Sequence, residues 1–328
     1  MNFTDRIRRK LSELSEILFP EAQRQKKAEA ASFFVTPFSP FMISDYYLSE
    51  EINELKLQYL NLASVCIGAR TVFKPNSVVF VQVDQLEEFE ESVLPSLKVP
   101  ITLITGKLNL PALSDTPAVR RILDSPHIVK WFSQNQVFEH LAIEPFPYGV
   151  DFFSAPAVLR ESQRAQKASK RTDLLVPFAT VHSHLPAQAK EIRTSLQPTM
   201  DKSRRNSEYL KSISSSKYVI SPPGDRGDTY RHWQCIALGA IPVSQLPRVF
   251  GKLFEGYIVL TDDLVGFSSS HTVGLQGMPN SRIAELRYWA DRTGSSWKGG
   301  SAETSSTGVM RMSQCNHRSR TRFFCRKS

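Results

Sequence analysis

A glycine-containing turn followed by charged residues is the part of the chain whose residue types and spacing could do chemistry. Gly224 and Gly227 lie in a polar turn between a hydrophobic strand at 218–221 and an expected helix. Glycines let a ligand approach the backbone closely, and a helix N-terminus attracts anions. Asp228 and Arg231 are three residues apart, so we expect them to share the helix face that looks back toward the turn. The turn is therefore expected to bind an anion such as a nucleotide phosphate.

The elements around this turn indicate a βαβ crossover. The strand at 218–221 precedes the turn, the expected helix spans 229–238, and Gly239 ends it ahead of a second apolar run at 240–243. Ligands of open α/β sheets bind at the carboxyl ends of the strands, which is where this turn would lie. The sequence therefore predicts an α/β fold with an anion-binding site in its C-terminal part.

This segment resembles the C-terminal motif of exostosin-type glycosyltransferases, Ser-Pro-x-Gly-Asp-Arg-x-Asp-x-Tyr-Arg-His-aromatic-Glu-Ala-Ile-x-Leu-Gly-x-Ile-Pro. The chain matches this motif at Ser221, Pro222, Gly224, Asp225, Arg226, Asp228, Tyr230, Arg231, His232, Trp233, Ile236, Leu238, Gly239, Ile241 and Pro242. Weaker similarity at 104–106, 127–135, 143–152 and 279–291 extends the resemblance over about residues 45–295.

The resemblance implies a GT-B-like architecture, in which two Rossmann-like domains flank a cleft and the C-terminal domain holds most of the donor. It also implies a transferase that needs no metal and no cofactor. A nucleotide sugar linked to UDP or GDP would give its sugar to the hydroxyl of a glycan or glycoconjugate acceptor. The donor-binding residues implied by the match are Ser221, Gly224, Asp225, Arg226, Gly227, Tyr230, Arg231 and Gln234.

One position departs from the family motif. The family usually has Glu after the aromatic residue, where it is expected to hold the ribose hydroxyls, and this chain has Gln234. An amide donates and accepts hydrogen bonds but lacks the charge that strengthens them. Two functions therefore stay open: an active glycosyltransferase, and a weak or inactive relative that binds a nucleotide sugar or a glycan.

Arg231 is the first candidate catalytic residue. A guanidinium behind such a turn can bind a diphosphate through two N–H groups and stabilise charge on the departing nucleoside diphosphate. Alternatively, Arg231 forms a salt bridge with Asp228 that only fixes the turn. Asp228 is the second candidate; it would cap the helix, the favoured reading, or bind a sugar hydroxyl. His232 would contact phosphate or be a satisfied, half-buried histidine.

The group that accepts the acceptor's proton is not determined by the sequence. Asp84 and Asp262 are candidates, Asp84 because it ends an expected strand at its carboxyl side. His182 and His184 would point the same way on a strand. No Asp, Glu or Cys lies close to them in sequence, so we expect a loop there and no metal site.

The chain divides into five expected segments. These are an N-terminal helix and lead-in at 1–44, an N-terminal Rossmann-like, acceptor-side domain at 45–151, a linker or exposed helix at 152–171, a C-terminal Rossmann-like domain that binds the nucleotide sugar at 172–298, and a basic disordered tail at 299–328. Expected strands lie at 65–68, 78–84, 101–105, 128–135, 143–147, 174–179, 218–221, 240–243 and 257–260. Expected helices lie at 7–18, 48–60, 86–94, up to 123, 207–216, 229–238 and 282–292.

Charge, cysteine spacing and hydropathy exclude several classes. The net charge is +9, and six basic residues against Glu303 alone give the tail at 299–328 +5 of it. We interpret this charge as that of a solvated tail without fixed structure. No nucleic acid is therefore expected as a partner, and a nucleic-acid-binding function ranks third. The cysteines form no CxxC pair. No apolar run approaches about 18 residues, so we expect no transmembrane segment. We expect the chain as written in the cytoplasm, or in the Golgi lumen if its true N-terminus lies upstream.

Overall fold

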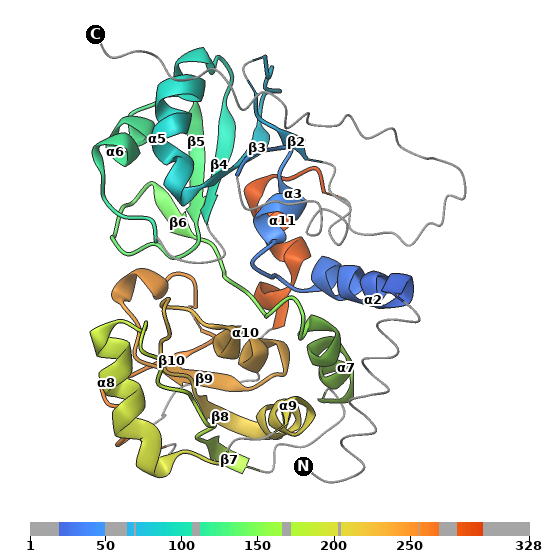
Figure 1. Ribbon diagram of the computed structural model, residues 1–328, viewed down its shortest axis with the longest axis vertical. Helices are drawn as coiled ribbons and strands as arrows, with labels where there is room; N and C mark the ends of the chain where they lie inside the picture. The colour runs from blue at the N-terminus through green and yellow to red at the C-terminus, as the bar shows by residue number, and fades with distance from the viewer. Residues whose placement is uncertain are drawn as a thin grey trace.

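Two parallel β-sheets, each flanked by helices, lie one above the other along the long axis of the molecule (Figure 1). The structure, a computed structural model, describes residues 20–49, 64–68, 70–106, 112–165, 172–202, 205–254, 256–268 and 281–297. The expected helix at 7–18, nearly all of that at 48–60 and the tail at 299–328 lie outside these residues. The α/β class predicted from the sequence is confirmed.

The first sheet has the strand order β2-β1-β3-β4-β5-β6, and every pair in it is parallel. The central strands β3 and β4 are buried along their whole length, because helices cover both faces of a parallel sheet. Their continuous runs of Val, Ile and Leu made them predictable. The strands are β1 (Tyr46–Leu48), β2 (Val65–Cys66), β3 (Ser77–Gln82), β4 (Ile101–Gly106), β5 (Ile128–Ser133) and β6 (Ile143–Pro145).

We call the part of the molecule that contains this sheet the first half and the part that contains the other sheet the second, or C-terminal, half. Short helices follow β3 and β4 in the first half. Helix α5 (Leu86–Glu88) continues into a wide helical turn at Phe89–Val93, in place of the regular helix expected at 86–94. Helix α6 (Pro117–Leu123) begins after Thr116, whose side chain accepts the Val119 N–H, and has proline at its first position.

The second sheet has the order β10-β9-β8-β7, again all parallel. The βαβ crossover predicted around the glycine-containing turn is confirmed, since β8 and β9 are adjacent and α10 joins them. Helix α8 was not predicted. The elements are β7 (Thr172–Leu175), α8 (Ala187–Leu196), α9 (Asn206–Ser214), β8 (Ser216–Ile220), α10 (Tyr230–Ala237), β9 (Ile241–Ser244) and β10 (Val259–Leu260).

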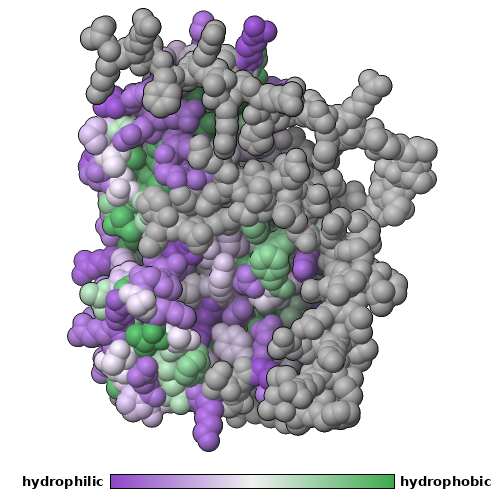
Figure 2. Space-filling model, viewed as in Figure 1, coloured by the Kyte–Doolittle hydropathy of each residue, from purple (hydrophilic) through white to green (hydrophobic). Residues whose placement is uncertain are grey.

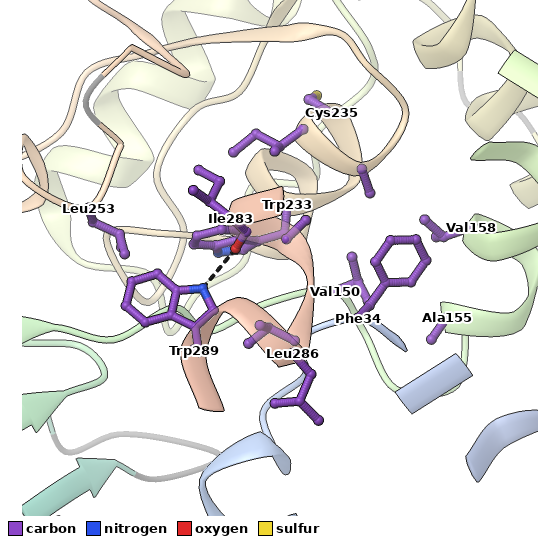
Figure 3. Packing of buried hydrophobic residues seen from close by; sticks show 14 of the residues in the cluster. Phe34, Val150, Ala155, Val158, Trp233, Cys235, Leu253, Ile283, Leu286 and Trp289 are labelled. Atoms are coloured by element: carbon purple, nitrogen blue, oxygen red, sulfur yellow. Dashed lines mark hydrogen bonds between the residues drawn. The ribbon is translucent and has the colours of Figure 1, made fainter. Parts of the chain in front are cut away.

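A continuous apolar cluster joins the two halves. It contains Phe80 and Ile104 from the first sheet together with Val219 and Trp233 from the second half. Figure 3 shows a part of it, in which the indole N–H of Trp289 donates to the carbonyl oxygen of Ile283 at 2.8 Å. The helices that contribute to it are α9 and α10 together with α2 (Pro20–Phe33), α3 (Ser39–Ile43), α7 (Ala155–Ala165) and α11 (Leu286–Thr293).

The helix expected as one possibility within 152–171 is present as α7, but the expectation that it is exposed is wrong for one of its faces. Ala155 and Val158 of α7 are fully buried and lie in the shared cluster. The other face of α7 is exposed to solvent and carries Arg and Gln residues. These polar residues dominate the composition of the segment, so the apolar stripe is not obvious from the sequence. Residues 166–171 lie outside the described part of the chain.

Helix α11 fastens the C-terminal end of the described chain onto the first half. The guanidinium of Arg292 pairs with the carboxylate of Glu144, and the hydroxyl of Ser295 donates to the carbonyl of Ile43. In Figure 1 this helix runs beside α3. The final helix expected at 282–292 is therefore confirmed, as a 3-10 turn at Ser281–Ala284 followed by α11.

None of the helices that the structure describes is both long and apolar enough to cross a bilayer. On the face shown in Figure 2, hydrophobic side chains form small separate patches among hydrophilic ones.

Only glycine fits at position 149, because the backbone there passes close to the backbone of Val35, in the segment that follows α2. Gly149 has φ +85°, and a Cβ added there would lie 2.2 Å from the carbonyl oxygen of Val35. We expect Gly149→Ala to lower the free energy of unfolding by about 3 kcal/mol or more, because left-handed backbone strain adds to a backbone clash. Gly294→Ala is the matched control, with φ +77° and open space around the added Cβ; it should cost about 1 kcal/mol. If urea unfolding shows the same loss of unfolding free energy for both variants, the backbone contact with Val35 is not the cause.

Candidate functional site

A pocket of about 520 Å³ lies at the carboxyl ends of β7 and β8. Its walls come from the segments that follow these strands, from α8, α9 and the first turns of α10, and from the N-terminal end of α7. This is the position at which open α/β sheets bind ligands. The lining residues are Asp151, Ser154, Pro177, Phe178, Arg193, Asp201, Lys202, Asn206, Tyr209, Pro222, Thr229, Tyr230, Arg231 and Gln234.

Two guanidinium groups, of Arg193 and Arg231, face this pocket. Arg231 donates from Nε to the hydroxyl oxygen of Tyr209 at 3.1 Å and from its two Nη atoms to the carbonyls of Pro177 and Phe178. Arg193 donates to the carbonyls of Pro223 and Thr180, at 2.8 and 2.7 Å. Within the described chain, neither forms an ion pair with a carboxylate. Neutral carbonyls therefore hold both cations in place.

The two guanidiniums influence each other electrostatically. Burial lowers the pKa of Arg193, and the positive charge of Arg231 lowers it further. Two like charges in a partly buried pocket repel each other, and an anion between them would remove that cost. The pocket is thus prepared for a negatively charged ligand.

The N-terminal end of α10 reaches the same pocket through Thr229, Tyr230 and Arg231. Thr229 is the N-cap residue, and its backbone N–H donates to Nδ1 of His232 at 3.0 Å, which is a capping box. The expectation that Asp228 caps this helix is therefore wrong. The partial positive charge of the helix end adds to that of the two arginines.

Asp228 serves a different purpose. It is fully buried, and its Oδ2 accepts the backbone N–H of Tyr148 at 2.7 Å and the indole N–H of Trp233 at 2.8 Å. Burial raises the pKa of this carboxyl. Asp228 precedes the N-cap residue and is buried, whereas Arg231 lines the pocket, and no salt bridge joins the two side chains. The expectations of a shared helix face and of a salt bridge between them are therefore wrong. With no exposed surface, Asp228 cannot touch a substrate in this conformation.

Arg226 and Asp225 lie behind the pocket, at the contact between the halves. The guanidinium of Arg226 stacks on the ring of Tyr148, 4.0 Å from its centroid, and pairs with Asp225 at 3.7 Å. The hydroxyls of Tyr148 and Tyr230 are 3.1 Å apart. Of these four residues, Tyr230 alone lines the pocket.

The two glycines of the turn make room for protein side chains. A Cβ on Gly227 would lie 2.1 Å from the ring of Phe250, and one on Gly224 would lie 3.0 Å from Cγ2 of Thr229 and 3.2 Å from Nη2 of Arg193. Gly224 thus lets Arg193 rest against the turn. Ser221 is fully buried, and its carbonyl accepts the hydroxyl of Ser244.

Gln234 lines the pocket as part of a hydrogen-bonded chain. The hydroxyl of Tyr209 donates to Oε1 of Gln234 at 3.1 Å while accepting the Nε–H of Arg231 at the same distance. Gln234 and Arg231 therefore hold fixed positions relative to each other. Of the expected donor-binding residues, Tyr230, Arg231 and Gln234 line the pocket.

The expected bases Asp84 and Asp262 do not line the pocket. Asp84 accepts a hydrogen bond from Gln82 after β3, and Asp262 is exposed after the edge strand β10. The imidazoles of His182 and His184 stack in a loop, as expected, with centroids 5.2 Å apart. No cluster of three His, Cys, Asp or Glu side chains suited to a metal occurs among the residues described.

Among the pocket residues that sequence reasoning did not single out are Arg193, Tyr209 and Asp151. The apolar residues Ala189, Ile192 and Leu196 recur at helical spacing and could have revealed α8, which carries Arg193. No sequence signal places these three residues beside Arg231, because they come from separate segments.

The chain matches no model of a known protein family, and no curated protein shows significant similarity to it. The assignment of a function therefore depends on the motif residues and on the geometry of this pocket.

His232 links the pocket to the pH dependence of stability. Its pKa is lowered to about 3 by burial first and by the charge of Arg231 second. Its Nδ1 accepts the Thr229 N–H, so the neutral ring carries its proton on Nε2 and donates to Ser244 at 2.9 Å. Because the unfolded chain binds a proton near pH 6.5 and the folded chain does not, this group's stabilisation is complete above that pH and is lost on acidification toward pH 3.

We expect His232→Gln to show a flatter pH dependence of stability than the wild type. Glutamine can keep the capping box but does not titrate. Between pH 6.5 and 4 the wild type should lose up to about 1.4 kcal/mol per pH unit relative to the variant. Comparing the two proteins cancels the opposite contribution of Asp228, whose raised pKa favours folding in acid. Parallel curves in denaturant titrations would show that His232 does not titrate on unfolding.

Proposed function

We propose that the chain is a glycosyltransferase that binds the diphosphate of a nucleotide sugar in this pocket and transfers the sugar to a hydroxyl of a glycan or glycoconjugate. The observation that carries the proposal is the pair of guanidiniums, Arg193 and Arg231, at the N-terminal end of α10, with no carboxylate paired to either in the described chain. The resemblance of 221–242 to the exostosin-type motif supports the same reading.

The number of guanidinium N–H groups that the described part of the protein leaves unused favours a ligand with several oxygens. A guanidinium has five N–H donors. Arg231 uses three of them and Arg193 two on groups of the described chain, which leaves five donors for a ligand. A diphosphate presents oxygens in the forked geometry that guanidiniums bind best.

The same groups would assist the chemical step. In a direct displacement at the anomeric carbon, the bond to the diphosphate breaks and negative charge accumulates on the leaving oxygen. Arg231, Arg193 and the helix dipole are already oriented toward this charge, so little reorganisation is required. We propose a GT-B-type division of labour, in which the C-terminal half holds the donor and the first half the acceptor.

An inactive or weak nucleotide-sugar-binding relative is the second candidate, favoured by the contacts of Gln234. Its Oε1 already accepts the Tyr209 hydroxyl. Its amide can therefore offer a ligand mainly N–H donors, whereas a glutamate would offer a second, charged oxygen to the ribose hydroxyls.

A thermal-shift panel of UDP, GDP and their sugar derivatives tests the binding site. For one base we expect a rise in Tm of roughly 5 °C at about 100 times Kd. Arg231→Ala should abolish the rise, since it removes a charge from the diphosphate site. Arg120→Ala, which removes an exposed arginine paired with Asp115, is the charge-matched control and should keep it. An unchanged rise in Arg231→Ala would exclude this pocket as the diphosphate site.

Gln234→Glu separates the two candidate functions. The carboxylate keeps the bond from Tyr209 and offers a charged acceptor to the ribose, so we expect binding of the selected nucleotide sugar to tighten about tenfold. Calorimetric titration of both proteins measures this. A gain in turnover as well would point to a weakened enzyme, whereas unchanged affinity would show that Gln234 already suffices.

A further inference from the structure

Asp151 places a carboxylate in the pocket that the sequence did not single out. It follows the loop that leads out of the first half and lies four residues before Ala155, the first residue of α7. Its Oδ2 accepts the backbone N–H of Ser154 at 2.8 Å, while its own carbonyl accepts the N–H of Ala155 at 2.9 Å. The start of α7 therefore fixes the orientation of this carboxylate.

The second carboxylate oxygen of Asp151, Oδ1, is not held in this way. Oδ1 accepts no hydrogen bond from the described residues, and the carboxylate forms no ion pair with them. The negative charge of Asp151 acts on Tyr230, the first residue of α10 and the neighbour of Arg231. An oriented basic oxygen thus lies in the same pocket as the proposed diphosphate site.

The other carboxylates near the motif are unsuitable. Asp228 is fully buried, and neither Asp84 nor Asp262 lines the pocket. Among the described lining residues, Asp201 is the other carboxylate, and it lies within the C-terminal half, after the 3-10 turn at Gln197–Thr199 that follows α8. Asp151 belongs instead to the segment that connects to the first half, the side on which an acceptor would enter under the proposed function.

We infer that Asp151 is the general base that activates the acceptor hydroxyl, an inference that rests on the proposed function. The acceptor O–H proton passes to Oδ1 of Asp151 as the oxygen forms its bond to the anomeric carbon. The bond between that carbon and the diphosphate breaks, and its electron pair leaves with the nucleoside diphosphate, whose charge Arg193 and Arg231 meet. The products are a glycoside, or a free sugar when water is the acceptor, and a nucleoside diphosphate.

Asp151→Asn is the decisive variant, because asparagine can still accept the Ser154 N–H but is not basic. The probe is hydrolysis of UDP-glucose, UDP-N-acetylglucosamine and GDP-mannose, with water as acceptor. We expect kcat to fall at least 100-fold, as general bases typically contribute that much or more. The donor KM should stay within about threefold, and the nucleoside-diphosphate Tm shift should persist. Asp262→Asn, outside the pocket, should keep the wild-type rate.

Each contrary outcome has a distinct meaning. A kcat for Asp151→Asn above one-tenth of wild type overturns the inference, as does a loss found in Asp201→Asn instead. Loss of the nucleotide-induced Tm shift in Asp151→Asn would also overturn it, since the residue would then act in binding. If the wild type binds a nucleoside diphosphate yet hydrolyses none of the three sugars, the inference fails while the binding site stands. If nothing binds, the proposed function fails with it.

Discussion

The architecture of the site depends on one buried carboxylate. Asp228 has no exposed surface, yet it joins the Tyr148 backbone of the first half to the indole of Trp233 in the second. A buried carboxyl group is costly unless hydrogen-bond donors reach it, and both donors reach its Oδ2, so the two halves can hold it only in a narrow set of arrangements. Arg226 stacked on Tyr148 adds a nearby positive charge. The loop that ends at Asp151 is thereby held against α10, and both reach one pocket.

The glycine-containing turn before α10 contacts side chains of the protein at both of its glycines. At Gly227 the ring of Phe250 occupies the space that a Cβ would take, and at Gly224 a Cβ would crowd Thr229 and Arg193. The turn thus positions guanidiniums in addition to the end of α10. Under the proposed function, these two charged donors would bind phosphate oxygens more strongly than neutral amides, so the arginines would supply most of the affinity for the diphosphate.

The two arginines share the pocket with Asp151 and Asp201 but form no ion pair with a carboxylate of the described chain. Carbonyls of Pro177, Phe178, Thr180 and Pro223 orient them without neutralising them, so their charge stays available to a ligand. His232, one residue beyond Arg231, is kept neutral by burial and by that same charge. The local excess of positive charge therefore belongs to the pocket and not to the core behind it.

The sequence by itself determined the elements whose signal is local. The apolar runs of β3, β4, β8 and β9 and the turn before α10 were predictable, because strands buried in a parallel sheet need continuous apolar residues. Helices α2 and α8 were missed, since their polar residues outnumber a thin apolar stripe. Only the tertiary structure could bring Asp151, Arg193 and Tyr209 to Arg231, and bury Asp228 at the contact between the halves. Their neighbours come from distant segments, and burial and charge coupling exist only after those segments pack together.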